Sequence, residues 1–293
     1  MIRLRLLLFL ALLFGLWACS PSNQVTPTPS AIPSTTPSPR ASPTASRVPS
    51  TPTATPPTCL HQPPRVDNGE IDTTKPPQLF LIYLPPCYDQ KTDQRYPVLY
   101  LLHGQTYDDG QWVRLGAPQA ADQLIRSGQA PPFIMVFPDD RYWNLPEESG
   151  FGDRVANVII PYIDSNYRTL ADRQDRAVGG LSLGGGWAAH LGLTRYDLFG
   201  SVGLHSPAIR EEDGPYIESW IKAVPSASWP RIWIDAGDRD SGLGSIRQFE
   251  NLLSDYQVPH EWHMYTGDHS ETYWSAHVTE YLQWYAEGWK SSP

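Results

Sequence analysis

The chain has 293 residues, a formal net charge of −9 and an aromatic content of 12%. No basic patch or nucleic-acid motif interrupts this acidic composition, so we do not expect nucleic acid as a partner, and the lysine-poor surface offers no electrostatic basis for binding anionic lipid. The length exceeds what one α/β domain needs, which leaves residues for segments outside the globule.

The first residues are typical of an export signal. A basic start at residues 1–5 precedes an apolar run at residues 6–18, and Cys19 follows directly. The run is shorter than the roughly 20 residues that span a bilayer. Residues 16–19 resemble a bacterial lipoprotein processing site, so we expect a signal peptide at residues 1–18 and a lipid on Cys19. The alternative is an ordinary signal peptide with a coincidental cysteine.

A linker separates this start from the globular part. Residues 20–58 contain 11 Pro, 9 Thr and 8 Ser and no aromatic residue. Such a composition cannot bury enough apolar surface to offset its chain entropy, so we predict a disordered linker at residues 19–58. Its prolines favour an extended backbone of roughly 3 Å per residue, which suits a stalk. The alternative is a tail without a function.

Cys59 and Cys87 remain as an even pair if Cys19 is lipidated. An exported chain is in an oxidising compartment, so we predict a disulfide between them; two free buried thiols are the alternative. The bridge would join the start of the folded domain, residues 59–293, to the loop after its first expected strand.

Apolar runs alternate with helical patterns through this domain. We expect strands at residues 79–84, 98–102, 133–137, 177–181, 200–205, 231–236 and 260–265. We expect helices at residues 111–126, 154–167, 183–193, 246–256 and 273–289. Strands that are buried on both faces and alternate with helices predict an α/β fold with a mostly parallel central sheet flanked by helices. Sites in such sheets form at the carboxyl ends of the strands.

A glycine-flanked serine follows the strand expected at residues 177–181. Residues 180–184, Gly-Leu-Ser-Leu-Gly, have the pattern of a nucleophile elbow, in which the serine lies on a tight strand-to-helix turn. The residues two before and two after the serine approach each other, so side chains there would clash. The following helix presents its N-terminal end to a developing oxyanion. We predict Ser182 as the nucleophile; the alternative is a glycine-rich loop used for packing.

A nucleophilic serine needs a histidine that accepts its proton. His260 and His263 lie in the last expected strand, and His277 lies in the terminal helix. His269 lies in the loop directly after that strand, from which its side chain can reach Ser182 across the sheet edge. We therefore predict His269 as the base.

A carboxylate must orient this histidine, and in this architecture it precedes the histidine in the chain. The turn after residues 231–236 offers Asp238 and Asp240, and Asp235 lies within the strand end. We predict Asp240, which lies furthest into the loop. Asp238 and Asp235 stay as alternatives, and we expect Asp235 to act mainly through stability.

The strand at residues 98–102 ends at His103 and Gly104, where the chain can turn back toward the nucleophile. We predict an oxyanion hole made by the backbone amides of Gln105 and Leu183. For His103 we favour a loop-bracing hydrogen bond over proton transfer. The His-Glu-Trp-His run at residues 260–263 is one residue short of the zinc-helix spacing, so we expect no metal and no cofactor.

Several segments together resemble the esterase D branch of the α/β hydrolases. The matching segments are residues 83–88, 95–104, 179–185, 235–240 and 267–274, with Trp112. This group includes feruloyl and acetyl-xylan esterases, S-formylglutathione hydrolases, enterochelin-type esterases and mycolyltransferases. The resemblance implies an α/β-hydrolase fold without a large cap domain. It also implies the same triad, Ser182, Asp240 and His269, and the same oxyanion amides.

Aromatic residues are frequent in the expected site loops: Tyr107, Trp112, Tyr142, Trp143, Trp187, Tyr273 and Trp274. Their faces suit sugar rings or an aromatic acyl group, and we name Tyr142, Trp143 and Trp274 as candidate substrate-binding residues. Core packing is the alternative, and we favour it for Trp112 and Trp187. Asp139 and Asp140 either meet a substrate group or cap the loop after their strand.

These patterns predict a membrane-anchored serine esterase outside the cytoplasm, acting on polysaccharide or other extracellular esters, with the lipid as its membrane contact. One alternative is an acyltransferase, in which an alcohol outcompetes water at the acyl-enzyme. The other is a non-catalytic binding module on an esterase scaffold, which would have no reason to keep all three triad residues.

Overall fold

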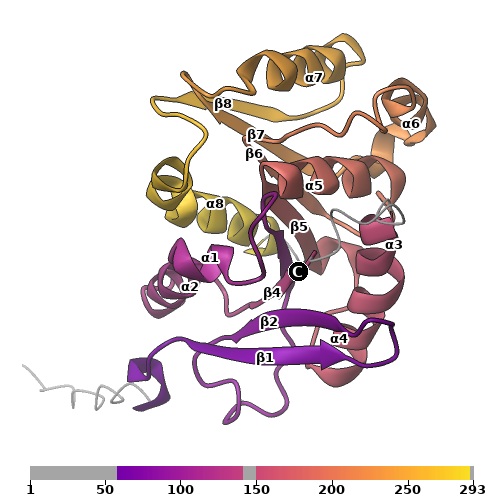
Figure 1. Ribbon diagram of the computed structural model, residues 1–293. Coiled ribbons are helices and arrows are strands. Elements are labelled where there is room, and N and C mark those ends of the chain that lie inside the picture. The colour runs from indigo at the N-terminus through magenta and orange to yellow at the C-terminus, as the bar shows by residue number, and fades with distance from the viewer. Residues whose placement is uncertain (1–57, 141–149, 291–293) are drawn as a thin grey trace, which may run out of the picture. The chain divides into compact units, whose positions relative to one another are not determined.

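The structure is a computed structural model that describes residues 58–140 and 150–290 (Figure 1). The expected signal peptide, Cys19 and most of the linker lie outside the described residues, as do Tyr142 and Trp143. Within the described part of the chain, no helix combines the length and apolar character needed to cross a bilayer.

Eight strands form one sheet in the order β1-β2-β4-β3-β5-β6-β7-β8. They are β1 (Arg65–Ile71), β2 (Gln78–Leu84), β3 (Val98–Leu102), β4 (Ile134–Pro138), β5 (Arg176–Leu181), β6 (Ser201–His205), β7 (Arg231–Gly237) and β8 (Glu261–Tyr265). β2 pairs antiparallel with β1 and β4, and every other pairing is parallel. The expected mostly parallel sheet is confirmed.

The strand that sequence patterns miss is β1, at the sheet edge. Its sequence, Arg-Val-Asp-Asn-Gly-Glu-Ile, is polar and half exposed, so it lacks the apolar run that marks the central strands. It pairs with β2 along its whole length, and Gly69 lies opposite Phe80. A side chain at Gly69 would collide with the Phe80 ring. Pairing with an apolar neighbour therefore makes this segment a strand.

The expected helix at residues 111–126 is two helices, α1 (Gln111–Arg114) and α2 (Ala117–Arg126). Gly116, between them, has φ 94°, a left-handed conformation that breaks the helix. The expected helix at residues 154–167 begins earlier, as α3 (Phe151–Arg154), and continues through a π-helical segment, η3 (Val155–Ile159), into α4 (Ile160–Asn166). Pro161 has no N–H to donate to the carbonyl four residues earlier in a regular α-helix. The π segment lies directly before this position in the chain.

The remaining helices are α5 (Leu183–Thr194), α6 (Ile217–Ala223), α7 (Leu243–Asp255) and α8 (Glu271–Lys290), with short 3-10 turns η1 (Thr58–His61), η4 (Arg173–Asp175) and η5 (Ser226–Ser228). Sequence patterns did not predict α6. Helices α1, α2 and α8 lie on one face of the sheet, and α4, α5, α6 and α7 lie on the other (Figure 1). The buried side chains of each group form a separate cluster of the core on that face. In the described residues, the strand connections hold only these elements and no separate cap domain.

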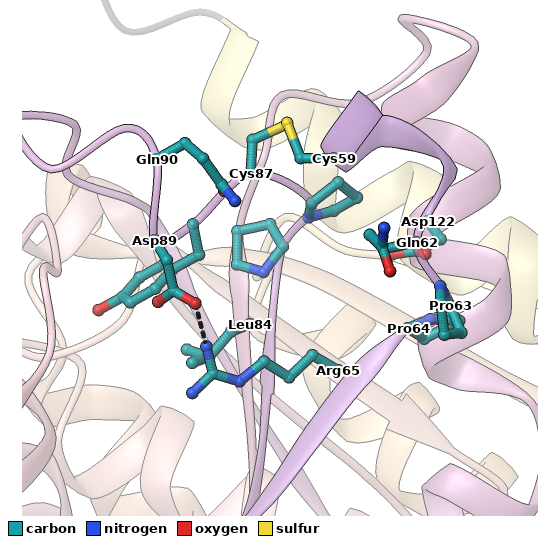
Figure 2. Close-up of a pocket in the computed structure, with 13 residues that line it drawn as sticks. Cys59, Gln62, Pro63, Pro64, Arg65, Leu84, Cys87, Asp89, Gln90 and Asp122 are labelled. Atoms are coloured by element: carbon teal, nitrogen blue, oxygen red, sulfur yellow. Dashed lines mark hydrogen bonds and ion pairs between the residues drawn. A yellow bond between two sulfur atoms is a disulfide. The ribbon is translucent and has the colours of Figure 1, made fainter. Parts of the chain in front are cut away.

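The expected disulfide between Cys59 and Cys87 is present, with 5.1 Å between the two Cα atoms. Figure 2 shows it beside a pocket of about 320 Å³ that Pro63, Pro64 and Arg65 also line. β2 runs antiparallel to β4, so its carboxyl end lies beside the amino ends of the parallel strands. β2 ends at Leu84, which lines this pocket. The pocket therefore lies at the sheet edge opposite the carboxyl ends of β3 to β8.

Candidate active site

Ser182 lies on the turn between β5 and α5, with φ 53° and ψ −121°. This backbone is strained for a residue with a side chain. A Cβ on Gly180 would collide with the backbone of Gly184, and one on Gly184 with the Leu102 carbonyl, so both positions require glycine. The Ser182 N–H donates to the His205 carbonyl at 3.0 Å, which ties the turn to the end of β6. The sequence therefore builds a nucleophile elbow at the carboxyl end of a central strand.

Three side chains from separate loops meet at this edge. His269, after β8, has its Nε2 atom 2.9 Å from Ser182 Oγ. Its Nδ1 atom lies 2.9 Å and 3.1 Å from the two carboxylate oxygens of Asp240, which follows β7. The structure thus brings together the three residues that the sequence singled out, in hydrogen-bonding order Ser-His-Asp. This arrangement can activate the serine as a nucleophile.

Asp240 is buried, yet its surroundings favour the carboxylate. Burial, the largest single influence, acts to raise its pKa, but hydrogen bonds from His269, the Gly242 N–H and Ser206, with the electrostatic interaction with His269, together hold the pKa below its ordinary value. The Gly242 N–H donates to Asp240 Oδ1 at 2.7 Å. An ionised Asp240 is therefore present to orient the His269 ring.

The two alternative aspartates have other partners. Asp238 accepts a hydrogen bond from the Gly267 N–H at 3.0 Å, so it holds the backbone of the histidine loop rather than the ring. Asp235 is fully buried in β7, and it accepts hydrogen bonds from the Trp233 indole at 2.9 Å and from the hydroxyls of Tyr273 and Tyr281, each at 2.8 Å.

The competing histidines are likewise engaged away from Ser182. His260 lies 3.2 Å from Glu250 and is bonded to the Val258 carbonyl. His263 stacks on the Trp233 ring with 3.6 Å between ring centroids. His277 pairs with Glu280 at 3.2 Å.

The loop after β3 carries the expected oxyanion amide. His103 Nδ1 lies 2.8 Å from the Gly104 carbonyl, and its Nε2 lies 2.8 Å from the Asp140 N–H. The carbonyl can only accept and the N–H can only donate, so the ring is neutral with its proton on Nδ1. Burial, the main cause, lowers the pKa of His103 and favours this neutral form. The ring braces the loop and does not contact Ser182.

Asp139 and Asp140 are buried at the end of β4. The Asp139 N–H extends the strand pairing to the Leu79 carbonyl, and Asp140 forms an ion pair with Arg154 at 3.1 Å. These contacts fit the loop-capping alternative.

A pocket of about 480 Å³ opens beside the nucleophile. It is lined by Gly104, Gln105, Thr106, Tyr107, Leu181, Ser182, His269, Ser270, Glu271 and Trp274. The N–H groups of Gln105 and Leu183 have no acceptor among the residues that the structure describes. Both N–H groups can therefore donate to an oxyanion that forms when Ser182 attacks a carbonyl carbon.

The aromatic candidates divide between pocket and core. Trp274 lines the pocket, is 3% exposed and packs edge-on against the His269 ring at 5.0 Å. Tyr107, 43% exposed, is the aromatic face on this pocket most open to solvent. Trp112, Trp187 and Tyr273 are buried in the core, as we favoured for the two tryptophans.

A mostly parallel eight-stranded sheet with a Ser-His-Asp arrangement at its carboxyl edge defines the class: an α/β hydrolase with a serine nucleophile elbow. Residues 73–285 match the model of the family described as "Putative esterase". The chain belongs to this esterase family.

Two relatives illustrate the match. An endo-1,4-beta-xylanase/feruloyl esterase of Xylanibacter ruminicola is 32% identical over 182 residues, which are 58% of this chain and 24% of that protein. An esterase of Mycobacterium tuberculosis is 26% identical over 242 residues, 64% of this chain and 51% of that protein. The chain thus spans about a quarter and about half of the lengths of these relatives.

Solved structures share the fold. A ferulic acid esterase superposes with a TM-score of 0.69 and 25% identity, covering 78% of this chain and 100% of that chain. An S-formylglutathione hydrolase of Staphylococcus aureus superposes with a TM-score of 0.64 at 19% identity, covering 77% and 98%. The expected resemblance to the feruloyl-esterase-like branch of the α/β hydrolases is confirmed, and the S-formylglutathione hydrolase shares the fold.

Proposed function

We propose that this protein hydrolyses carboxylic esters through an acyl-enzyme on Ser182, with His269 as the base and Asp240 as the orienting carboxylate. The observation that carries the proposal is the 2.9 Å approach of His269 Nε2 to Ser182 Oγ in the wall of an open pocket. Membership of an esterase family supports the same chemistry.

The steps follow from this geometry. His269 accepts the proton of Ser182 as the hydroxyl oxygen attacks the ester carbonyl, and Asp240 stabilises the imidazolium that forms. The amides of Gln105 and Leu183 donate to the oxyanion of the tetrahedral intermediate. His269 then protonates the departing alcohol, and a water molecule, activated by the same histidine, releases the acid.

We further propose that the enzyme works outside the cytoplasm, tethered by a lipid on Cys19 and a stalk at residues 19–58. The Cys59–Cys87 disulfide supports export, because such bridges persist in oxidising compartments. An exported enzyme meets the ester groups of polysaccharides. The open aromatic face of Tyr107 suits a sugar ring or an aromatic acyl group, and one relative is named as a xylanase/feruloyl esterase.

The test is a substrate panel on wild-type protein and the variant Ser182→Ala. The panel contains p-nitrophenyl esters and feruloylated and acetylated sugars, with and without an added alcohol acceptor. We expect Ser182→Ala to lose several orders of magnitude in turnover. Ser254→Ala, which removes an exposed hydroxyl on α7, is the matched control and should keep full activity.

A fluorophosphonate probe provides a second readout, and it should label Ser182 alone. Labelling of another serine, or full activity of Ser182→Ala, would overturn the proposed mechanism. Ester product formed with the added alcohol faster than free acid would instead favour the acyltransferase.

A further inference from the structure

The Gln111 side chain links the loop that carries the oxyanion amide to the helix that follows the histidine. Gln111 is the first residue of α1 and its side chain is fully buried. Its Oε1 atom accepts a hydrogen bond from the Gly104 N–H at 2.8 Å. Its Nε2 atom donates to Glu271 Oε1 at 3.2 Å. Glu271 begins α8, two residues after His269.

The contact with Gly104 bears directly on the nucleophile. A Cβ placed on Gly104 would lie 3.4 Å from Ser182 Cβ and 3.0 Å from a Leu181 methyl group, so the backbone of this loop packs against the elbow. A shift of the Gly104 backbone therefore changes the distance between the loop and Ser182.

The hydrogen bonds at Gly104 also determine where the Gln105 N–H points. A peptide unit is planar and trans, so the Gly104 carbonyl and the Gln105 N–H point in opposite directions. The carbonyl is held by His103 Nδ1 at 2.8 Å and by the Tyr107 N–H at 3.2 Å. Gln111 accepts a hydrogen bond from the Gly104 N–H, which belongs to the peptide unit before the Gly104 Cα. The peptide units on both sides of this Cα are thus restrained, and the direction of the Gln105 N–H with them.

Glu271 holds the opposite end of the link. Its carboxylate accepts a hydrogen bond from Arg114 at 2.6 Å as well as the one from Gln111. The hydrogen bond from Arg114 is the main cause that keeps the pKa of Glu271 below its ordinary value. The Arg114 guanidinium also lies 5.3 Å from the centre of the Tyr107 ring, at the far end of the oxyanion loop. Charged and aromatic contacts at the pocket rim therefore reinforce the buried link.

We propose that Gln111 and Glu271 are positioning residues that couple the Gln105 oxyanion amide to the His269 loop. This inference rests on the proposed function, because it assigns a role to groups around the proposed oxyanion hole. Neither side chain contacts the reacting atoms. An oxyanion donor acts only when it lies within hydrogen-bonding distance of the developing charge, so loss of the link weakens binding of the tetrahedral intermediate.

The first test removes the link. Gln111→Leu keeps the side-chain bulk but deletes both hydrogen bonds. We expect kcat/KM for a p-nitrophenyl ester to fall about 30-fold, less than the 10²–10³ typical of losing an oxyanion donor outright. The affinity for a boronic acid, whose tetrahedral adduct on Ser182 mimics the intermediate, should fall in parallel. Glu218→Gln, which alters an exposed carboxylate paired with Lys222 on α6, is the matched control and should change neither value.

The second test exchanges donor and acceptor. Gln111→Glu keeps the acceptor for Gly104 but sets a carboxylate against Glu271, and we expect a loss of about 10-fold in kcat/KM. The double variant Gln111→Glu/Glu271→Gln restores one donor between the two side chains and should recover most of that loss. A purely structural role would change the unfolding midpoint without this rescue.

The outcomes separate the two proposals. Wild-type protein that neither turns over esters nor reacts with the probe at Ser182 would defeat the proposed function. An active wild type, together with a folded Gln111→Leu variant of undiminished kcat/KM and boronate affinity, would overturn the positioning role alone. If Gln111→Leu does not fold, the double variant decides, and a folded double variant without recovery also overturns the coupling.

Discussion

The carboxylate of Asp238 accepts a hydrogen bond from the Gly267 N–H at 3.0 Å, two residues before His269. Asp240, two residues further along the same turn, binds the His269 ring at 2.9 Å. The turn after β7 therefore holds the histidine loop twice, at its backbone through Asp238 and at its side chain through Asp240. The two aspartates have different partners, and their substitution should have different consequences.

Asp240→Asn should lower kcat by at least about 100-fold more than Asp238→Asn, equivalent to roughly 3 kcal/mol in the transition state. Only Asp240 can stabilise the imidazolium formed when His269 takes the Ser182 proton. Steady-state kinetics on a p-nitrophenyl ester measure the difference, with circular dichroism to establish equal folding. A larger loss in Asp238→Asn, with both variants folded, would make Asp238 the orienting carboxylate.

Asp235→Asn should act on stability. The carboxylate is fully buried, and it binds His205 Nδ1 at 2.7 Å as well as the indole of Trp233 and the hydroxyls of Tyr273 and Tyr281. In asparagine, an NH2 group replaces one carboxylate oxygen, so a donor would face groups that now donate to Asp235. We expect this variant to lose about 3 kcal/mol of unfolding free energy. Urea unfolding measures this loss.

Asp197→Asn is the control for Asp235→Asn, because Asp197 forms an exposed ion pair with Arg195. It should change the unfolding free energy by less than about 1 kcal/mol. If Asp235→Asn instead keeps its stability and loses turnover as Asp240→Asn does, Asp235 has a direct part in the chemistry.

The double variant Cys59→Ser/Cys87→Ser should lose about 3–4 kcal/mol of unfolding free energy. The bridge closes a loop with a sequence separation of 28, and reduction frees the unfolded chain from that constraint. Turnover at low temperature should stay unchanged, because the bridge lies at the sheet edge opposite Ser182. Urea unfolding of oxidised and dithiothreitol-treated wild type provides the comparison, and equal midpoints would contradict the expected stabilisation.

Stability should depend on pH through His103. Burial lowers the pKa of His103 in the folded protein from its ordinary value of 6.5. The unfolded chain therefore binds a proton as pH falls below about 6.5 while the folded protein does not, so stability decreases until the lower folded pKa is reached. Between about pH 7.5 and about pH 5.5, wild type should lose more unfolding free energy than His103→Asn. Parallel stability curves for the two proteins would show that His103 does not cause the loss.

Cys19→Ser should move the protein from the membrane fraction to the periplasm or medium. This follows from the proposed lipid anchor, because Cys19 is the residue that would be acylated after removal of residues 1–18. Immunoblots of membrane and soluble fractions measure the partition. Unchanged membrane association would assign retention to an uncleaved signal or to the domain itself.

Local patterns predicted much of the fold. Apolar runs identified the strands from β2 to β7, because strands buried on both faces need apolar side chains at consecutive positions. The edge strand β8 was also expected, although none of its residues is buried. Local patterns missed β1, whose polar residues become a strand through pairing with β2, and α6, a short helix of seven residues. The single helix expected at residues 111–126 was wrong, because Gly116 separates two helices.

The candidate site, like the fold, could be predicted from the sequence only in part. The elbow around Ser182 could be predicted because its geometry depends on five consecutive residues, and glycines at positions 180 and 184 are a local requirement. The position of His269 after the last strand followed from strand order. The sequence by itself thus determined which loops carry the serine and the histidine.

The sequence favoured Asp240 among three candidate aspartates, and tertiary structure decided between them. Tertiary structure alone decided which side chains hold the oxyanion loop. Asp235, Asp238 and Asp240 lie within six residues, and only the packing of two loops 29 positions apart separates their roles. Gln111 carries no motif, and its partner Glu271 is 160 positions away. Hydrogen bonds of this kind depend on distances set by the folded sheet, so they leave no periodic or local pattern in the sequence.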